Sequence, residues 1–284
     1  KWAIVTGSTS GIGKEFAEEF ARLGMSIMLI SRTESKLKEQ ADDISNKYKV
    51  NVKYMVYDFS TFSSNNTNSK LFYNKLKDEC KILSKDGGLG ILLNNVGTNE
   101  DHPMLYDEYD DDGVDNMINC NVQSVLYMTK TVLPIMKLQK NGTVISIGSG
   151  SANHPGPYNA LYSATKAFML QFSRSMHVEN WDTGVDFLCV TPFYIVSNLY
   201  KRKSGTILAP MPIELVKGTI SQLGKKYIWQ GHGYWFHGML GNMATYFWGT
   251  TARWRKMMVD NRKRWDERQA ANANANANAN KESK

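Results

Sequence analysis

The stretch Thr6-Gly7-Ser8-Thr9-Ser10-Gly11-Ile12-Gly13 decides the fold of this chain. It follows an apolar, β-rich run, and a helical pattern begins at Gly13. Glycines suit this place because the backbone must turn sharply and approach an anion closely. The following helix aims its free N–H groups and its positive dipole end at that anion. The stretch therefore predicts the first strand–turn–helix unit of a dinucleotide-binding sheet.

Short apolar strands alternate with helical stretches up to about residue 190. We expect strands at residues 3–6, 26–30, 50–57, 90–94, 143–147 and 185–190, and helices at residues 13–23, 34–49, 70–83, 114–140 and 158–181. This alternation predicts an α/β fold, a Rossmann-like doubly wound parallel sheet in a single domain. After about residue 200 the alternation fades, and no seventh strand is placed.

Composition and local bias divide the chain further. With 284 residues, 42% hydrophobic and 21% charged, the chain is typical of a globular protein with a sizeable core. We expect a catalytic domain over residues 1–200 and a C-terminal part over residues 201–269 that caps the substrate and faces a membrane or partner. A low-complexity Ala-Asn tail over residues 270–284 should have no stable fold of its own. Residues 60–69 and 100–112 are predicted to be loops, polar and acidic respectively.

Charge and tryptophan gather in the C-terminal part. The net charge is +7, and basic clusters occupy residues 201–203 and 253–268 beside five of the seven tryptophans: Trp229, Trp235, Trp248, Trp254 and Trp265. This combination favours a membrane interface; an aromatic core with a solvated basic face stays open as the alternative. No nucleic-acid-binding module accompanies the charge. No apolar run is long enough to span a membrane, and any anchor is expected in a longer precursor, upstream of Lys1.

Metal binding is not predicted. The three cysteines, Cys80, Cys120 and Cys189, lie far apart without metal spacing, which indicates free thiols in a reducing compartment. None of the five histidines has metal-ligand spacing either. His154 is a candidate border of the substrate pocket, although such a loop histidine usually faces solvent. His237 is expected to pack.

The second predicted strand argues for NADP(H) as the cofactor. An NAD enzyme usually places a carboxylate at the end of this strand to accept hydrogen bonds from the ribose 2′-hydroxyl. Here the strand ends Leu29-Ile30-Ser31-Arg32, without an acid. Arg32 can instead pair with a 2′-phosphate through charge-assisted hydrogen bonds.

Tyr162 and Lys166 are candidate catalytic residues. They stand four residues apart on a predicted helix, and therefore on one face of it. A tyrosine titrates near 10; a neighbouring ammonium favours the phenolate and is expected to lower that pKa, so that the pair becomes a usable general acid and base.

The spacing Gly-x-x-x-Gly-x-Gly and the order Asn121, Ser149, Tyr162, Lys166 resemble the classical short-chain dehydrogenases/reductases over most of the chain. The resemblance implies that Ser149 binds the substrate carbonyl, Tyr162 protonates it, Lys166 binds the ribose and tunes Tyr162, and Asn121 holds a water that links Lys166 to solvent. Asn94-Asn95-Val96-Gly97 is similar to the family's Asn-Asn-Ala-Gly element. The implied cofactor contacts are Gly7, Ser10, Gly11, Ile12, Gly13, Arg32, Asp58, Asn95, Gly97, Tyr162, Lys166, Pro192, Ile195 and Ser197.

Several segments narrow the resemblance to one branch. Residues 192–199, Pro-Phe-Tyr-Ile-Val-Ser-Asn-Leu, resemble the Pro-Tyr-Phe-Val-Ala-Thr-Lys-Leu segment of microsomal 3-ketoacyl-CoA reductases and 17β-hydroxysteroid dehydrogenases of types 3 and 12. The Asn-Asn-Val-Gly form at residues 94–97, and residues 148–151, 155–157 and 233–241, agree with this branch.

The branch implies NADPH-dependent reduction of a lipid carbonyl. A 3-oxoacyl-CoA in very-long-chain fatty acid elongation is the first expectation, and a 17-ketosteroid is the second. It also implies the endoplasmic reticulum membrane, with a mitochondrial membrane as the alternative, and a homodimer or larger membrane assembly. A different class stays open: an accessory or structural subunit of a membrane assembly that retains a reductase fold.

Overall fold

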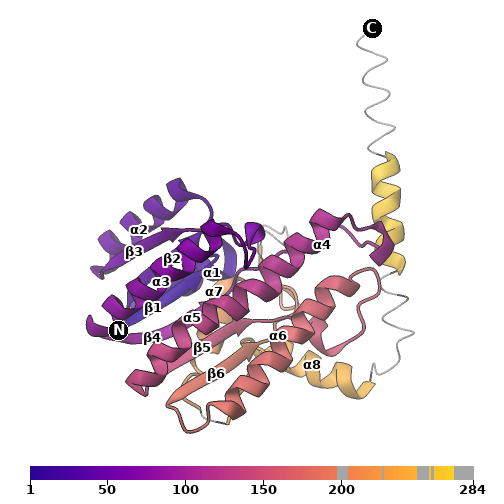
Figure 1. Cartoon of the computed structure of the whole chain (residues 1–284). Helices are drawn as coiled ribbons and strands as arrows, with labels where there is room; N and C mark the ends of the chain where they lie inside the picture. Colours follow the sequence, from indigo (N-terminus) through magenta and orange to yellow (C-terminus); the bar gives the residue numbers. More distant parts are fainter. Residues whose placement is uncertain (197–203, 226, 248–255, 257–258, 272–284) are drawn as a thin grey trace.

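A seven-stranded, fully parallel sheet forms the centre of the molecule (Figure 1). The computed structural model describes residues 1–196, 204–225, 227–247, 256 and 259–271, and no side chains over residues 242–247. The strands run in the order β3-β2-β1-β4-β5-β6-β7. Their bounds are Trp2–Thr6 for β1, Ser26–Ser31 for β2, Val52–Val56 for β3, Leu89–Asn94 for β4, Gly142–Ile147 for β5, Val185–Val190 for β6 and Gln230–Gly231 for β7. The predicted α/β class and the six predicted strands are confirmed.

The seventh strand was not predicted, and its length explains why. β7 contains only two residues, which pair with Cys189 and Val190 of β6. Two residues cannot display the apolar run or alternation that identifies a strand in a sequence. The sheet therefore extends past the point where the strand–helix alternation of the sequence ends.

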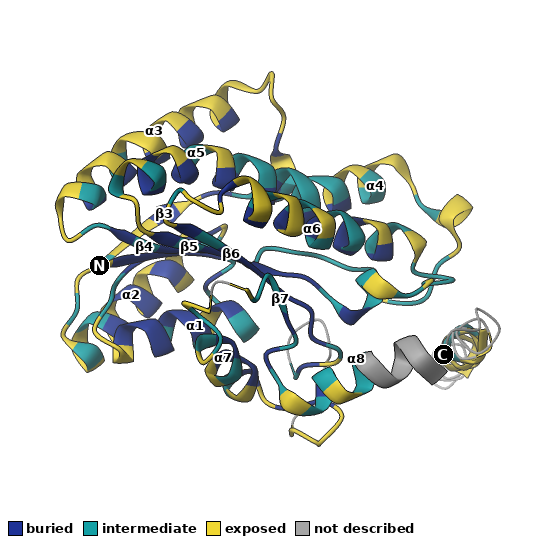
Figure 2. Ribbon diagram, turned by 90° about the horizontal axis from the view of Figure 1, so that it is seen from below, coloured by how far each residue is buried: buried dark blue, intermediate teal, exposed yellow. Residues whose placement is uncertain are grey.

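Helices cover both faces of the sheet (Figure 2). One face carries α1 (Gly11–Arg22), α2 (Glu34–Tyr48) and α7 (Pro212–Ile220), and the other carries α3 (Thr67–Lys85), α4 (Asp111–Ile118), α5 (Ser124–Gln139) and α6 (Ala160–Glu179). The helix α8 (Trp235–Phe247) follows β7. Short 3₁₀ turns lie at Phe59–Thr61, Tyr106–Glu108 and Gly150–Asn153. The predicted loops at residues 60–69 and 100–112 therefore contain the beginnings of α3 and α4 as well as two of these turns.

The prediction of one continuous helix over residues 114–140 is wrong in one respect. A π-helical segment, Asn119–Gln123, separates α4 from α5. The Ser124 N–H bonds to the Asn119 carbonyl, five residues back, and the Ser124 hydroxyl donates to the Cys120 carbonyl at 2.5 Å. A one-residue bulge of this kind leaves the apolar period of the sequence nearly unchanged, so periodicity alone did not reveal it.

The two faces of β1 feed two separate cores. Trp2 and Ile4 belong to the cluster under α3 and α5, whereas Ala3 and Val5 belong to the cluster under α1 and α2. Successive strand side chains point to opposite faces. All five residues of β1 are buried, which is why the strand is a continuous apolar run rather than an alternating one.

The strand order creates a crevice at the carboxyl end of β1. β1 lies between β2 and β4, and the chain winds away from β1 in opposite directions on the two sides. Ligands of open α/β sheets bind at such a switch point. The glycine turn at residues 7–13 follows β1 and the segment 94–97 follows β4, so both lie at this crevice.

The residues that the structure describes cover only part of the C-terminal predictions. Residues 259–271 are helical, so Ala270 and Ala271, which were predicted to belong to the unfolded tail, are part of a helix. The rest of the Ala-Asn tail lies outside the described residues. Ser197, the basic cluster at 201–203, and Trp248 and Trp254 also lie outside them. Within the part that the structure describes, every helix is too short or too polar to cross a bilayer. The domain boundaries at residues 200 and 269 stay predictions.

Candidate active site

The glycine turn forms a tight cradle at the beginning of α1. Gly7 and Gly11 adopt φ values of +62° and +54°, which only glycine adopts without strain. A Cβ on Gly13 would overlap the Gly7 carbonyl oxygen and the Asn95 amide, so the third glycine permits close contact between turn, helix and β4 loop. The Asn95 Nδ2 donates to the carbonyls of Thr6 and Gly7, both at 3.1 Å.

This cradle fits a pyrophosphate. Ser10 stands at the N-cap of α1 without a side-chain cap, so its side chain leaves the N–H groups of the first turn available to a ligand. The Ser8 hydroxyl beside it is buried and has no hydrogen-bond partner. Unpaired donors at a helix N-terminus, where the dipole is positive, suit the phosphates of a dinucleotide.

The predicted adenosine-side residues surround the end of β2. Ser31 is buried, and its hydroxyl lies 3.0 Å from the Thr9 hydroxyl of the glycine turn. Arg32 is exposed. Asp58, at the end of β3, caps the following 3₁₀ turn by accepting from the N–H and hydroxyl of Ser60 at 3.0 and 2.7 Å. Burial raises the pKa of the Cys120 thiol to about 11; the negative charge of Asp58 acts in the same direction and the positive charge of Arg32 in the opposite one.

The four predicted catalytic residues come from three separate segments that meet at this crevice. Asn121 lies in the π-helical segment, Ser149 directly after β5, and Tyr162 and Lys166 in α6. Gly97 draws the β4 loop against them: a Cβ there would lie 3.2 Å from Asn121 Oδ1 and 3.4 Å from Lys166 Nζ. A glycine is required at this position by close approach rather than by a backbone angle.

Asn121 is fully buried and its amide is satisfied by the protein. Its Oδ1 accepts from the Thr98 N–H at 2.8 Å, and its Nδ2 donates to the Thr98 carbonyl and the Thr165 hydroxyl, both at 3.0 Å. The side chain therefore ties the β4 loop to α6. Both N–H groups of this amide are engaged, so a water that Asn121 holds would bind to an oxygen of this residue.

Burial shifts Tyr162 and Lys166 in opposite directions. Burial raises the pKa of Tyr162 to about 12; a hydrogen bond with Ser149 acts to lower it, and the charge of Glu100 raises it. Burial lowers the pKa of Lys166 to about 8. The Lys166 Nζ donates to the Ile147 carbonyl at 3.0 Å and lies 5.5 Å from the centre of the Tyr162 ring.

The predicted lowering of the Tyr162 pKa by Lys166 is therefore wrong for this structure. The ammonium lies over the ring and is directed to a backbone carbonyl, while burial disfavours the phenolate. Tyr162 stays protonated at neutral pH, which is the state that can give a proton to a carbonyl oxygen.

The loop after β6, predicted to contact the nicotinamide side of the cofactor, packs against the loop that carries Ser149. The Gly150 N–H donates to the Pro192 carbonyl at 2.8 Å, which holds this loop against the loop that carries Ser149. Ile195 is buried. His237 of α8 is fully buried; its Nδ1 accepts from the Phe193 N–H at 3.3 Å, and its Nε2 lies 3.2 Å from the Leu208 carbonyl. Its expected packing role is confirmed.

Three nearby residues were missed by sequence reasoning. Ser151 donates to the Ser149 hydroxyl from both its N–H (3.2 Å) and its hydroxyl (3.0 Å), and Thr98 binds Asn121. Glu100 has a buried Oε1 without a hydrogen-bond partner, and burial raises the pKa of its carboxyl. Glu100 stands three residues after Gly97, so its closeness in sequence to the Asn-Asn-Val-Gly element could have indicated that it lies near the site.

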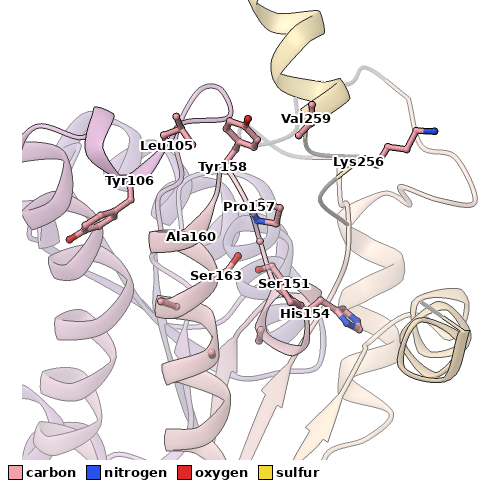
Figure 3. A pocket seen from close by; sticks show the side chains of 15 residues that line it. Leu105, Tyr106, Ser151, His154, Pro157, Tyr158, Ala160, Ser163, Lys256 and Val259 are labelled. Atoms are coloured by element: carbon pink, nitrogen blue, oxygen red, sulfur yellow. The ribbon is translucent and has the colours of Figure 1, made fainter. Parts of the chain in front are cut away.

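A cavity of about 1290 Å³ lies beside these residues (Figure 3). Ser151, His154 and Tyr158 line it from the loop after β5, and Ser163 lines it from α6. His154 is partly buried there, which lowers its pKa. Among the described residues, no three His, Cys, Asp or Glu side chains gather closely enough to hold a metal ion.

Comparison with known proteins agrees with this geometry. The family described as short chain dehydrogenase matches residues 1–206. The chain belongs to this family. It is therefore an oxidoreductase, and the predicted resemblance to the family is confirmed.

Curated relatives come from one branch of the family. The very-long-chain 3-oxoacyl-CoA reductase-B of Danio rerio is 38% identical over 243 residues, 85% of this chain and 74% of the relative. The Homo sapiens very-long-chain 3-oxoacyl-CoA reductase is 36% identical, with 86% and 75% covered. The enzyme of the same name from Emericella nidulans is 34% identical, with 89% and 72% covered.

Solved structures share the fold. A 7β-hydroxysteroid dehydrogenase matches with a TM-score of 0.76 at 23% identity, covering 91% of this chain and 96% of that protein. A short-chain dehydrogenase of Sphingobium yanoikuyae in complex with NADPH matches with a TM-score of 0.68 at 22% identity, covering 80% and 85%.

Proposed function

We propose that this protein reduces the 3-oxo group of a long-chain acyl-CoA with NADPH, as in very-long-chain fatty acid elongation. The observation that carries the proposal is the identity of 34–38% to very-long-chain 3-oxoacyl-CoA reductases over 85–89% of the chain. The convergence of Asn121, Ser149, Tyr162 and Lys166 at the switch point supports it, because these groups suit carbonyl reduction.

The residues present fit NADP(H). The glycine cradle and the orphan Ser8 hydroxyl suit the pyrophosphate, and exposed Arg32 at the end of β2 suits a 2′-phosphate. Asp58, Asn95, Gly97, Pro192 and Ile195 would hold the remaining parts. When bound, NADPH supplies the hydride.

Each catalytic side chain has a separate task in the proposed reaction. The Ser149 hydroxyl, held by Ser151, donates a hydrogen bond to the carbonyl oxygen of the substrate. Tyr162, protonated at neutral pH, gives its proton to that oxygen as negative charge develops. Lys166 would bind the ribose through its ammonium group. Asn121 ties the β4 loop to α6 and thereby positions both.

A substrate panel tests the proposal. Oxidation of NADPH should follow addition of a long-chain 3-oxoacyl-CoA and be much slower with a 17-ketosteroid.

The Tyr162→Phe variant should bind NADPH normally and lose roughly 10²–10⁴-fold in kcat. Lys166→Ala should lose both rate and NADPH affinity, because its ribose contact exists before the reaction. Tyr54→Phe, on the edge strand β3, serves as the control. NADPH binding without reduction of any lipid carbonyl would favour the accessory-subunit alternative.

We further propose that α8 and the segment before α7 rest on a membrane surface. Trp235 and Met239 are 66% and 43% exposed, one turn apart on α8, while Ile207, Leu208 and Met211 are exposed in the neighbouring segment. His237 joins the two through the Leu208 carbonyl. Neighbouring exposed apolar side chains suit an interface. Of the other tryptophans, Trp229 packs under Arg174 and Trp265 stacks on His102, so these two partly buried rings contact side chains of the protein itself.

Vesicle sedimentation tests this surface. Trp235→Ser combined with Met239→Ser should reduce binding to vesicles with anionic lipid, and Leu138→Ser on α5 should leave it unchanged. Equal binding of the double variant and the Leu138 variant would contradict the assignment.

The endoplasmic reticulum is the membrane that we propose, and microscopy of the tagged natural protein with reticulum and mitochondrial markers distinguishes the two locations. Cross-linking of the same material reports a homodimer or a larger assembly.

A further inference from the structure

The cavity beside the active site is large and mainly apolar. Its walls include Leu105, Ala152, Pro155, Pro157 and Ala164. Its volume of about 1290 Å³ exceeds the roughly 300–1,000 Å³ that is usual for small-ligand pockets. Figure 3 shows Val259 of the C-terminal helix on the side opposite Ser151 and His154.

The cavity begins where the reacting carbonyl would bind. Ser151 lines the cavity, and its hydroxyl donates to the Ser149 hydroxyl at 3.0 Å. Ser163 and Ala167 line it from α6, and each directly follows a catalytic residue, Tyr162 or Lys166, in the sequence. The cavity therefore adjoins the proposed carbonyl site, with the Ser151 hydroxyl between the two.

A set of contacts that we call the latch holds the outer wall. The latch consists of Arg262 and Trp265 on the helix over residues 259–271, with His102, Pro103 and Glu108 on the facing loop. Arg262 donates to both Glu108 carboxylate oxygens at 2.6 and 2.9 Å and to the Pro103 carbonyl at 2.9 Å. The Trp265 ring stacks on His102 at 3.9 Å between centroids.

The latch connects directly to the cavity lining on both sides. Glu108 also accepts from the Leu105 N–H at 2.8 Å, and Leu105 lines the cavity. Val259, one turn before Arg262, lines it from the helix. A bidentate arginine–carboxylate pair fixes orientation as well as distance. Loss of the pair would free both walls together.

We propose that this cavity holds the acyl chain of the thioester substrate, and that the latch sets the chain length that the enzyme accepts. The inference rests on the proposed function. A mainly apolar space that adjoins Ser149 through Ser151 suits a chain attached next to the reacting carbonyl. Each buried methylene contributes about a fourfold gain in affinity, so removing the wall penalises long chains and spares short ones.

The test compares two chain lengths in matched arginine variants. Acetoacetyl-CoA and 3-oxohexadecanoyl-CoA serve as the short and long substrates. Arg262→Ala should lower kcat/KM at least tenfold for the long substrate and less than twofold for the short one. Arg264→Ala is the control, since Arg264 lies exposed on the same helix and donates to the Asp260 carbonyl of that helix. Equal losses for both substrates, or no loss for the long one, would overturn the role of the latch.

A charge exchange and a filled cavity keep the test independent of folding. Arg262→Glu with Glu108→Arg should recover most of the long-chain activity that either single change removes. Ala164→Phe should place a ring in the cavity and shift preference toward the short substrate, whereas Val178→Phe, on an exposed part of α6, should not. Unchanged long-chain preference in Ala164→Phe would show that the chain lies elsewhere.

Failure of the proposed function gives a different result. A wild type that oxidises NADPH with neither thioester contradicts the reductase activity. Calorimetric binding of palmitoyl-CoA to the NADP⁺-loaded protein then tests the cavity directly. Binding that Ala164→Phe weakens tenfold or more supports the chain site, and the absence of binding to the wild type overturns it.

Discussion

Burial sets the protonation states of Tyr162 and Lys166 before any cofactor is considered. The pKa of Tyr162 rises to about 12 and that of Lys166 falls to about 8. A protonated tyrosine suits carbonyl reduction at neutral pH, while alcohol oxidation needs the phenolate and should accelerate as the pH rises. Two residues four apart on a helix therefore do not act as an isolated pair.

Glu100→Gln is expected to change this balance. The negative charge of Glu100 raises the pKa of Tyr162, so its removal should lower that pKa. Reduction requires the protonated tyrosine, and the alkaline fall of kcat/KM should move to lower pH. The pH–rate profile measures the shift, with exposed Asp101→Asn as the control. An unchanged alkaline limb would mean that Glu100 does not act on Tyr162.

The same substitution should affect thermal stability in a defined direction. Burial raises the pKa of the Glu100 carboxyl, so the stability of the protonated form is present at low pH and lost as pH rises through the folded pKa. The Glu100→Gln variant should therefore have a higher Tm than the wild type at pH 8, and the difference in Tm between the two proteins should shrink toward pH 4.

Arg32→Asp is expected to weaken the preference for NADPH over NADH. A charge-assisted bond to the 2′-phosphate contributes roughly 1.5–3 kcal/mol, so the ratio of kcat/KM values should fall at least tenfold. Lys36→Asp makes the same charge change on exposed α2 and controls for long-range effects. If both variants lower the ratio equally, the general field rather than Arg32 selects the cofactor.

At the scale of elements, α8 supports the loop that carries Pro192. Replacing His237 with Phe would remove its hydrogen bonds to the Phe193 N–H and the Leu208 carbonyl, at about 0.5–1.5 kcal/mol for each of these part-buried bonds. We expect a lower midpoint in urea and a higher KM for NADPH. His237→Gln keeps a polar group and should lose less of both. Equal losses in the two variants would point to ring packing against Phe193 instead.

At the scale of the whole molecule, two cores share one sheet. Leu92 and Leu93 are adjacent and fully buried, yet Leu92 packs in the cluster under α3 and α5 and Leu93 in the cluster under α1 and α2. Because every central strand contributes to both clusters, we expect the two faces to unfold together.

Leu92→Ala and Leu93→Ala should each lower the free energy of unfolding by about 2–5 kcal/mol in a single transition. Leu138→Ala, which changes a side chain that is 85% exposed, should change it by less than about 0.5 kcal/mol. Urea unfolding followed by tryptophan fluorescence and by circular dichroism gives the comparison. Two separated transitions in either core variant would show that the faces unfold independently.

Local pattern was sufficient for the layered fold. Strand–helix alternation and the glycine turn depend on backbone geometry and on periodicity, whereas the order of Asn121, Ser149, Tyr162 and Lys166 was predicted from a family resemblance and stays a prediction. The two-residue strand β7 and the π-helical bulge at residues 119–123 escaped prediction, because neither leaves a period long enough to detect.

Tertiary structure decided what no local pattern contains. The pKa of Tyr162 depends on burial and on Glu100, and the position of Lys166 depends on the Ile147 carbonyl, nineteen residues away. The latch joins Glu108 to Arg262 across 154 positions of the chain. Burial, charge coupling and cavity walls arise from residues distant in sequence, so the sequence by itself determined the sheet and the reacting groups, and only packing determined their protonation and the space beside them.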